Sequence, residues 1–162
     1  MFVLEKPAIL LVEDGEDDVV MIRCALKEAK IDLPLHVVRD GREAIAYLSG
    51  EGKYGSADYP IPALVLLDLR MPRVDGFAVL RWMRRQPHLN AVRVVVLTNS
   101  LEPSDAHKAY DLGANSFLTK PTDFKDTTRL LLLLIAQWVP AGLHRRSPCS
   151  RFKFSEPIRH SA

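Results

Sequence analysis

The sequence predicts an α/β protein built on a parallel β-sheet with helices on both faces. Short apolar runs alternate along the chain with segments of helical periodicity, which is typical of such sheets. Runs such as residues 64–67 (LVLL) lack in-and-out alternation, which predicts strands that are covered on both sides. A length of 162 residues with 48% hydrophobic residues is enough for one domain with a substantial core.

Five apolar runs are the expected strands, four of them rich in Val, Ile or Leu and the last short: residues 8–12, 35–38, 63–67, 92–97 and 116–118. Apolar residues with helical spacing predict a helix after each run, and Pro103 suits the start of the fourth. The expected helical segments are residues 19–29, 44–48, 77–83, 103–112 and 123–139. Residues 51–62 contain Gly, Pro and Ser and are expected to form a long loop.

Charge separates the C-terminal residues from the rest of the chain, whose formal net charge is +2. Residues 140–162 hold five Lys or Arg and one Glu, a net charge of +4, which leaves −2 for residues 1–139. We therefore expect residues 1–139 to form the domain and residues 140–162 to be a basic extension, with no output domain. The acidic body disfavours nucleic-acid binding, and the extension alone would bind nucleic acid weakly and with strong salt dependence.

The expected location is the cytoplasm. Cys24 and Cys149 belong to no Cys-x-x-Cys pair, which argues against a zinc or dithiol site. The chain starts with a short apolar run and no basic leader, unlike a signal peptide. The longest apolar run, residues 130–136, is too short to span a membrane, so no membrane association is expected.

Polar residues follow four of the expected strands. Glu13 and Asp14 follow the first, Asp68 the third, Thr98 the fourth and Lys120 the fifth. Because the carboxyl ends of parallel strands meet at one edge of a sheet, we expect these side chains to form one site. Clustered carboxylates suit Mg²⁺, a carboxylate can accept a phosphoryl group, and a lysine can offset the charge on the transferring oxygens.

Each of these residues also has a simpler explanation when it is taken alone. Glu13 and Asp14 lie in an acidic stretch that a solvated loop would explain. Asp68 alone would be a helix cap or turn former, Thr98 a strand-end hydroxyl and Lys120 part of a surface turn. Their joint occurrence at four strand ends favours a functional site.

Four segments resemble, in this order, those of the response-regulator receiver domains of two-component signalling: ILLVED, LVLLDLRMPRVDG, VVVLT and GANSFLTKP. The resemblance covers about residues 7–139 and implies a flavodoxin-like, doubly wound (βα)5 parallel sheet with strand order 2-1-3-4-5. The long loop at residues 51–62, the DLxxPxxDG pattern and the lack of a DNA-binding domain resemble single-domain regulators that serve phytochrome-type histidine kinases.

The resemblance implies a role for each strand-end residue. Asp68 would be the phosphoacceptor. Glu13 and Asp14 would bind Mg²⁺, with Asp14 the more direct ligand. Lys120 would contact the phosphoryl group, and Thr98 would be the switch hydroxyl that moves toward it.

The resemblance also implies roles for neighbouring residues. The backbone carbonyl of Arg70 would be a third protein ligand of the metal ion, beside Asp68 itself. Phe117 would take the aromatic switch position. The bond between Lys120 and Pro121 would be a cis peptide.

Three residues depart from the usual pattern of the family. The guanidinium of Arg70 could pair with the phosphoryl oxygens or with Glu13, and in either place it would shield the acyl phosphate and slow self-dephosphorylation. The alternative is that Arg70 points to solvent. Asn99 is larger than the residue usually found there and could narrow access to the site. Phe117 lacks the hydroxyl of a tyrosine, so a looser switch is expected.

The expected function is a phosphorylation-dependent signalling switch and not an enzyme. A sensor histidine kinase would donate the phosphoryl group, and the output would be contact with a downstream protein target. The alternative is a pseudo-receiver that binds partners without phosphorylation. A phosphatase with an aspartate nucleophile is disfavoured, because Arg70 stands where such an enzyme usually has a general acid. A P-loop enzyme is excluded, since no GxxxxGK[ST] occurs.

Residues 130–135 are six consecutive apolar residues in the expected last helix. They cover every side of that helix, whereas packing on a sheet buries only a stripe, so some should face outward. The resembled family often pairs through its fourth helix, fifth strand and fifth helix, which predicts a homodimer through that face. The alternative is that the C-terminal extension covers the leucines.

Two further expectations concern helix surfaces. Cys24 lies near the apolar face of the first helix and is expected in the core. The pair Arg84 and Arg85 is expected to form a solvated helix end.

Overall fold

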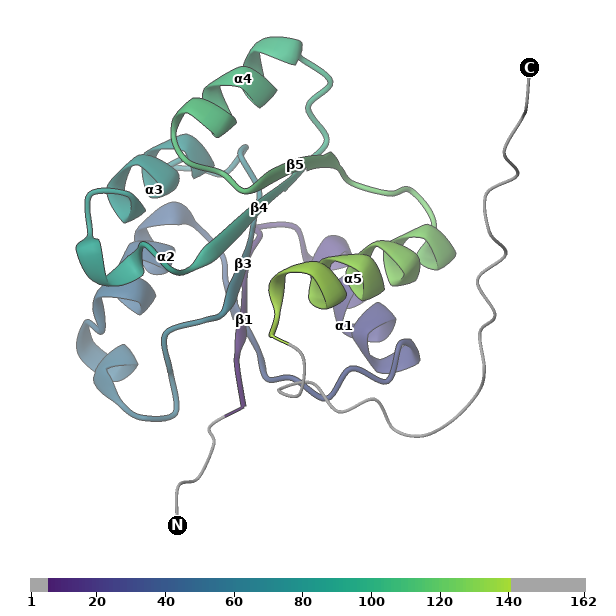
Figure 1. Cartoon of the computed structure of the whole chain (residues 1–162), viewed down its shortest axis with the longest axis horizontal. Coiled ribbons are helices and arrows are strands. Elements are labelled where there is room, and N and C mark those ends of the chain that lie inside the picture. The colour runs from purple at the N-terminus through teal and green to yellow at the C-terminus, as the bar shows by residue number, and fades with distance from the viewer. Residues whose placement is uncertain (1–5, 141–162) are drawn as a thin grey trace.

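A computed structural model of the chain describes residues 6–140 (Figure 1). Strands and helices alternate along this part, as predicted. The elements are β1 (Ile9–Val12), α1 (Glu16–Glu28), β2 (Leu35–Val38), α2 (Gly41–Ser49), the 3-10 turn η1 (Gly52–Gly55), β3 (Leu64–Leu67), α3 (Gly76–Met83), the 3-10 turn η2 (Pro87–Leu89), β4 (Arg93–Thr98), α4 (Pro103–Asp111), β5 (Ser116–Thr119) and α5 (Phe124–Trp138).

The strands form one parallel sheet in the order β2-β1-β3-β4-β5, which confirms the expected topology. The register keeps the carboxyl ends of the central strands level, because Val12 pairs with Leu67 and Leu67 with Val96. Helices α1 and α5 cover one face of the sheet, and α2, α3 and α4 cover the other (Figure 1).

Strand residues alternate between two apolar cores, one on each face of the sheet. In β1, Leu10 and Val12 belong to the core under α2, α3 and α4, whereas Ile9 and Leu11 belong to the core under α1 and α5. All four positions of β1 and of β3 are therefore buried, which explains why their sequences lack alternation. Each fully buried leucine contributes roughly 2 kcal/mol to folding.

Helix boundaries follow from capping groups. The side chains of Asp40, Asp75 and Asp123 accept N–H bonds in the first turns of α2, α3 and α5. Pro103 is the first residue of α4, as expected. Helices α1 and α2 begin three residues before the expected ranges, because their first turns carry few core-facing residues.

Gly76 opens α3 directly against the end of β3. A Cβ atom at this position would lie 2.3 Å from the backbone oxygen of Asp68 and 2.8 Å from the Cα of Leu69. The N–H of Gly76 donates to the oxygen of Leu69 at 3.0 Å. Glycine is therefore required for the close approach of the two backbones, which packs the start of α3 against Asp68 and Leu69.

The loop at residues 51–62 is packed rather than open. Tyr54, at its start, is buried and donates its hydroxyl to Glu43 of α2 at 2.7 Å. The Tyr47 hydroxyl donates to the backbone oxygen of Pro60 at 3.0 Å. Ring centroids of Tyr47, Tyr54 and Tyr59 lie 5.0–5.8 Å apart, and burial raises the pKa of Tyr47 to about 12. This aromatic cluster holds the loop on α2.

The expectation for Cys24 is wrong, and the one for the arginine pair holds only for Arg85, which is exposed. Cys24 is exposed, because the buried face of α1 carries Val19, Ile22, Ala25 and Leu26 instead. Arg84 is half-buried, and its guanidinium donates to the backbone oxygens of Leu89, Val92 and Gly113 and to Asn115 Oδ1. Burial lowers the pKa of this guanidinium. Arg84 thus ties the end of α3 to the turns beside β4 and β5.

The expected C-terminal extension, residues 140–162, lies outside the described residues except for Pro140. Within residues 6–140, no helix combines the length and the apolar content that a membrane crossing requires.

Candidate functional site

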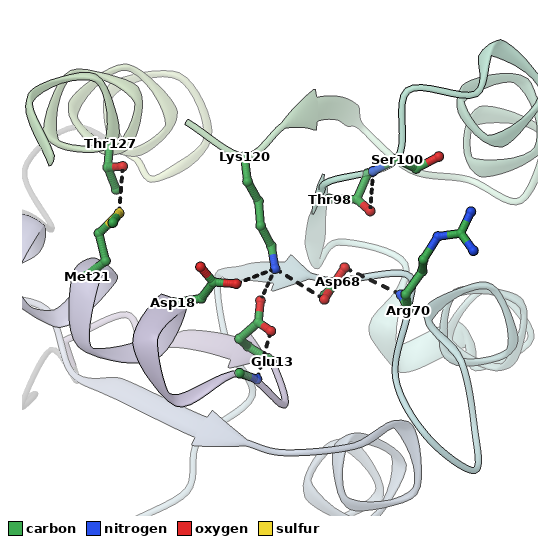
Figure 2. Close-up of polar contacts among 10 residues, drawn as sticks. Glu13, Asp18, Met21, Asp68, Arg70, Thr98, Ser100, Lys120 and Thr127 are labelled. Carbon is green, nitrogen blue, oxygen red and sulfur yellow. Dashed lines mark hydrogen bonds and ion pairs between the residues drawn. The ribbon is translucent and has the colours of Figure 1, made fainter. Parts of the chain in front are cut away.

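Polar side chains from four strand ends meet at the carboxyl edge of the sheet, as predicted (Figure 2). Carboxylate oxygens of Glu13, Asp14 and Asp68 lie within 4.8 Å of one another. The Nζ of Lys120 enters the same cluster from the end of β5. Thr98, the last residue of β4, completes the set of strand-end residues and is fully buried.

Lys120 makes three contacts with carboxylates. Its Nζ lies 2.5 Å from Glu13 Oε2, 2.8 Å from Asp18 Oδ2 and 3.2 Å from Asp68 Oδ2 (Figure 2). The lysine side chain is only 9% exposed. An ammonium group has three donors, so each donor has a carboxylate acceptor.

Sequence reasoning missed Asp18. It lies in the acidic first turn of α1, together with Glu16 and Asp17. Acidic residues are common in the first turn of a helix, because they interact favourably with its dipole, so composition alone did not single out one of the three. The available signal was topology, since a helix that follows β1 starts at the edge of the sheet where Lys120 lies.

Burial and charge act in opposite directions on the cluster. Burial raises the pKa of the Glu13 carboxyl, although Lys120 and the N–H of Gly15 both favour its ionised form. Burial alone would lower the pKa of the Lys120 ammonium. Hydrogen bonds to Asp18 and Glu13 and the charge of Asp68 outweigh this effect and raise the pKa above its ordinary value. Lys120 is therefore a fixed positive charge beside Asp68.

Glu13 and Asp14 differ in exposure although they are adjacent. Glu13 is 2% exposed, and its Oε1 accepts the N–H of Gly15 at 3.0 Å. Asp14 is exposed. The Asp14 carboxylate is therefore open to solvent, whereas that of Glu13 is enclosed by the protein.

The two expected switch residues lie on neighbouring strands, Thr98 at the end of β4 and Phe117 within β5. Thr98 Oγ1 accepts the N–H of Ser100 at 3.2 Å, so its own hydrogen remains available to a new acceptor. Phe117 in β5 is half-buried against the core under α2, α3 and α4. Its N–H donates to the Tyr110 hydroxyl of α4 at 3.1 Å.

Arg70 and Asn99, which depart from the family pattern, both have side chains that lie outside the cluster. The N–H of Arg70 donates to Asp68 Oδ1 at 3.4 Å, whereas its guanidinium lies 3.6 Å from Asp105 Oδ2. Of the two partners considered for the guanidinium, Glu13 is not in contact with it and pairs with Lys120, and the Arg70 side chain is largely exposed to solvent. Asn99 is exposed and makes no side-chain hydrogen bond within residues 6–140.

The expectation of a cis bond between Lys120 and Pro121 is wrong. Residues 6–140 contain no cis peptide bond, so this bond is trans. The trans form is the more stable one for most bonds that precede proline. Pro121 is half-buried beside the lysine.

Comparisons with known proteins agree with the fold. Residues 9–131 match the response regulator receiver domain family. Response regulator Rcp1 of Synechocystis is 38% identical over 131 residues, which are 81% of this chain and 88% of that protein. The probable methanogenesis regulatory protein FilR2 of Methanothrix harundinacea is 37% identical over 131 residues, which are 81% of this chain and 83% of that protein.

Solved structures of two response regulators are also similar. The Mn²⁺-bound form of Rcp1 has a TM-score of 0.74 and 37% identity, and the match covers 83% of this chain and 96% of that one. The phosphorylated cyanobacterial phytochrome response regulator RcpA has a TM-score of 0.77 and 34% identity, and the match covers 86% of this chain and 99% of that one. On these grounds, the chain belongs to the response regulator receiver domain family.

Proposed function

We propose that this protein is a phosphorylation-dependent signalling switch that accepts a phosphoryl group on Asp68 from a sensor histidine kinase. The observation that carries the proposal is the place of Asp68, a buried carboxylate that contacts Lys120 and lies close to the acidic pair Glu13 and Asp14. This combination supplies a nucleophile, a fixed cation and a set of metal ligands at one strand edge.

In the proposed reaction, a carboxylate oxygen of Asp68 attacks the phosphorus of a phosphohistidine. The new O–P bond forms as the P–N bond breaks, and the electron pair of the broken bond stays on the imidazole nitrogen. Lys120 offsets charge on the phosphoryl oxygens, and the N–H of Arg70 orients the carboxylate. After transfer, the Thr98 hydroxyl can donate to a phosphoryl oxygen.

The donor set fits Mg²⁺. The oxygens of Glu13, Asp14 and Asp68 lie close enough together to share one ion, and oxygen donors of this kind are the ones that Mg²⁺ prefers. We propose the backbone carbonyl of Arg70 as a further ligand. A bound Mg²⁺ would neutralise charge on the carboxylates and on the phosphoryl oxygens. Binding of Mn²⁺ by the relative Rcp1 supports a divalent metal site here.

The proposed output is a change in the surface formed by α4, β5 and α5, driven by movement of Thr98 and Phe117 and read by a downstream protein. The protein would act in the cytoplasm as a slowly self-dephosphorylating phosphoacceptor and not as an enzyme. Neither nucleic acid nor a membrane would be a partner. Similarity to RcpA, a phytochrome response regulator, supports a phytochrome-type kinase as the donor.

Intact mass spectrometry tests the proposed function. We expect one added phosphoryl group after incubation of the full chain with acetyl phosphate and Mg²⁺. We expect none in an Asp68→Asn variant, and none when Mg²⁺ is removed by a chelator. Wild-type protein that stays unmodified over hours would contradict the proposal and favour a pseudo-receiver that binds partners without phosphorylation.

We also propose a homodimer through the α4-β5-α5 face. Leu133 of α5 is 60% exposed and Tyr110 of α4 is 51% exposed, and both helices flank the edge strand β5. Burying these apolar side chains against a second copy would favour association. A two-fold interface would pair this face with itself.

Replacing Leu133 with glutamate should therefore convert a dimer to a monomer in sedimentation experiments on the full chain. Val20→Glu is the matched control, because Val20 is a comparably exposed apolar residue on α1, outside the proposed face. Wild-type protein that sediments as a monomer at all concentrations would contradict the dimer.

A further inference from the structure

Arg70 has two possible acidic partners, and the structure shows it with the one outside the site. Its backbone N–H donates to Asp68, but its guanidinium points away from the Asp68 carboxylate (Figure 2). The guanidinium instead lies 3.6 Å from Asp105 in the first turn of α4. The Arg70 side chain is 72% exposed, whereas that of Asp105 is 20% exposed.

Asp105 is held in place independently of Arg70. Its Oδ2 accepts the Ser100 hydroxyl at 2.5 Å. The backbone N–H of Ser100 in turn donates to the hydroxyl oxygen of Thr98. Asp105 is therefore a fixed acceptor, connected through Ser100 to the end of β4, and Arg70 is the mobile partner of the ion pair.

Arg70 has room to change partners. It lines an open cavity of about 380 Å³ together with Asp105 and with Leu69, Met71, Asp75 and Phe77. The ion pair with Asp105 is exposed on the arginine side, and such pairs contribute little stability. A phosphorylated Asp68 would present a doubly charged group with several acceptor oxygens, which a guanidinium binds more strongly than a single carboxylate.

We propose that Asp105 is a positioning residue that holds the Arg70 side chain away from Asp68 until Asp68 is phosphorylated. This inference rests on the proposed phosphorylation of Asp68. The phosphoryl group then competes for Arg70, which leaves Asp105 and covers the acyl phosphate. When Arg70 leaves, Asp105 in the first turn of α4 loses its positive partner. Phosphorylation of Asp68 would therefore affect α4 through the loss of this ion pair as well as through movement of Thr98.

The exchange controls the lifetime of the acyl phosphate. In hydrolysis, a water oxygen attacks the phosphorus and releases its proton to solvent. The P–O bond to Asp68 breaks, and its electron pair returns to the carboxylate. A guanidinium on the phosphoryl oxygens blocks the approach of this water. Asp105 competes for Arg70 and therefore shortens the lifetime.

The test compares decay of the phosphoryl group in four proteins after acetyl phosphate is removed, by intact mass. Asp105→Asn should lengthen the half-life about three-fold relative to wild type, because it frees Arg70 while keeping an acceptor for Ser100. Arg70→Asn should shorten the half-life. The double variant should decay like Arg70→Asn, because loss of Asp105 matters only when Arg70 is present. Asp111→Asn removes the same charge at the far end of α4 and should match wild type.

A spectroscopic measurement tests the contact itself. The Nε–H resonance of Arg70 should shift on phosphorylation of the wild-type protein, and Asp105→Asn should shift it without phosphorylation. A longer half-life that persists in the double variant would overturn the inference, because it would show a general charge effect of Asp105. Equal half-lives of the phosphoryl group in all four proteins would also overturn the inference. Wild-type protein that takes up no phosphoryl group would overturn the proposed function, and the inference with it.

Discussion

Replacing Arg84 with alanine should lower the free energy of unfolding by about 3 kcal/mol. The guanidinium donates at 3.1 Å to the oxygen of Gly113 and at 3.2 Å to the oxygens of Leu89 and Val92. Without it, these backbone acceptors lose a charged donor that water replaces poorly in a half-buried place. For a domain of this size, the loss corresponds to a fall of ~10 °C in the midpoint of thermal unfolding.

The neighbouring arginine provides a control for the Arg84→Ala measurement. Arg85 is the next residue and is exposed, so Arg85→Ala should change stability by no more than about 0.5 kcal/mol. Arg84→Lys should recover only part of the loss, because an ammonium cannot reproduce the planar fork of a guanidinium. Chemical denaturation measures all three variants. Equal stability of Arg84→Ala and Arg85→Ala would show that the contacts of Arg84 carry no net stabilisation.

Replacing Lys120 with alanine should slow phosphorylation of Asp68 by acetyl phosphate about 100-fold. The variant keeps the nucleophile and the acidic pair but loses the cation 3.2 Å from Asp68. It should also lose about 3 kcal/mol of stability at neutral pH, because Glu13 and Asp68 would remain as buried carboxylates without their cation. Lys125→Ala, which removes an exposed lysine from α5, is the control for both measurements.

Added Mg²⁺ separates the two effects of this variant. An ion shared by the carboxylates would offset their mutual repulsion, so Mg²⁺ should raise the unfolding midpoint of Lys120→Ala more than that of the wild type. The phosphorylation rate should remain low, because the metal does not take the place of the lysine. A variant that is phosphorylated at the wild-type rate would contradict the role proposed for Lys120.

The fold was predictable because both faces of the sheet are covered. Each strand is then a short, continuous apolar run, and the expected strands agree with the structure within one residue at each end. The site was predictable for a related reason. Parallel strands bring their carboxyl ends to one edge of the sheet. The residues at or just after the ends of β1, β3, β4 and β5 could therefore be expected to lie close together.

Contacts that depend on geometry rather than pattern were not predictable. Arg84 contacts backbone oxygens, and every sequence contains these. The pair of arginines at the end of a helix therefore gave no indication that Arg84 is half-buried. Asp18 is one of three consecutive acidic residues. Only its position on the helix places it, and not its two neighbours, in contact with Lys120. Asp105 is brought to Arg70 by the packing of α4 beside the loop after β3, which neither segment encodes locally.

The contacts of Lys120 with three carboxylates also determine how late in folding the cluster assembles. The lysine is separated from them by 107, 102 and 52 residues in the chain, so the cluster cannot form until β5 has joined the sheet. During synthesis, a nascent chain that has exposed Asp68 but not residue 120 lacks the cation that contacts Asp68 in the complete fold. Under the proposed function, such a chain would be a poor phosphoacceptor, so a kinase would signal only through chains in which β5 is in place.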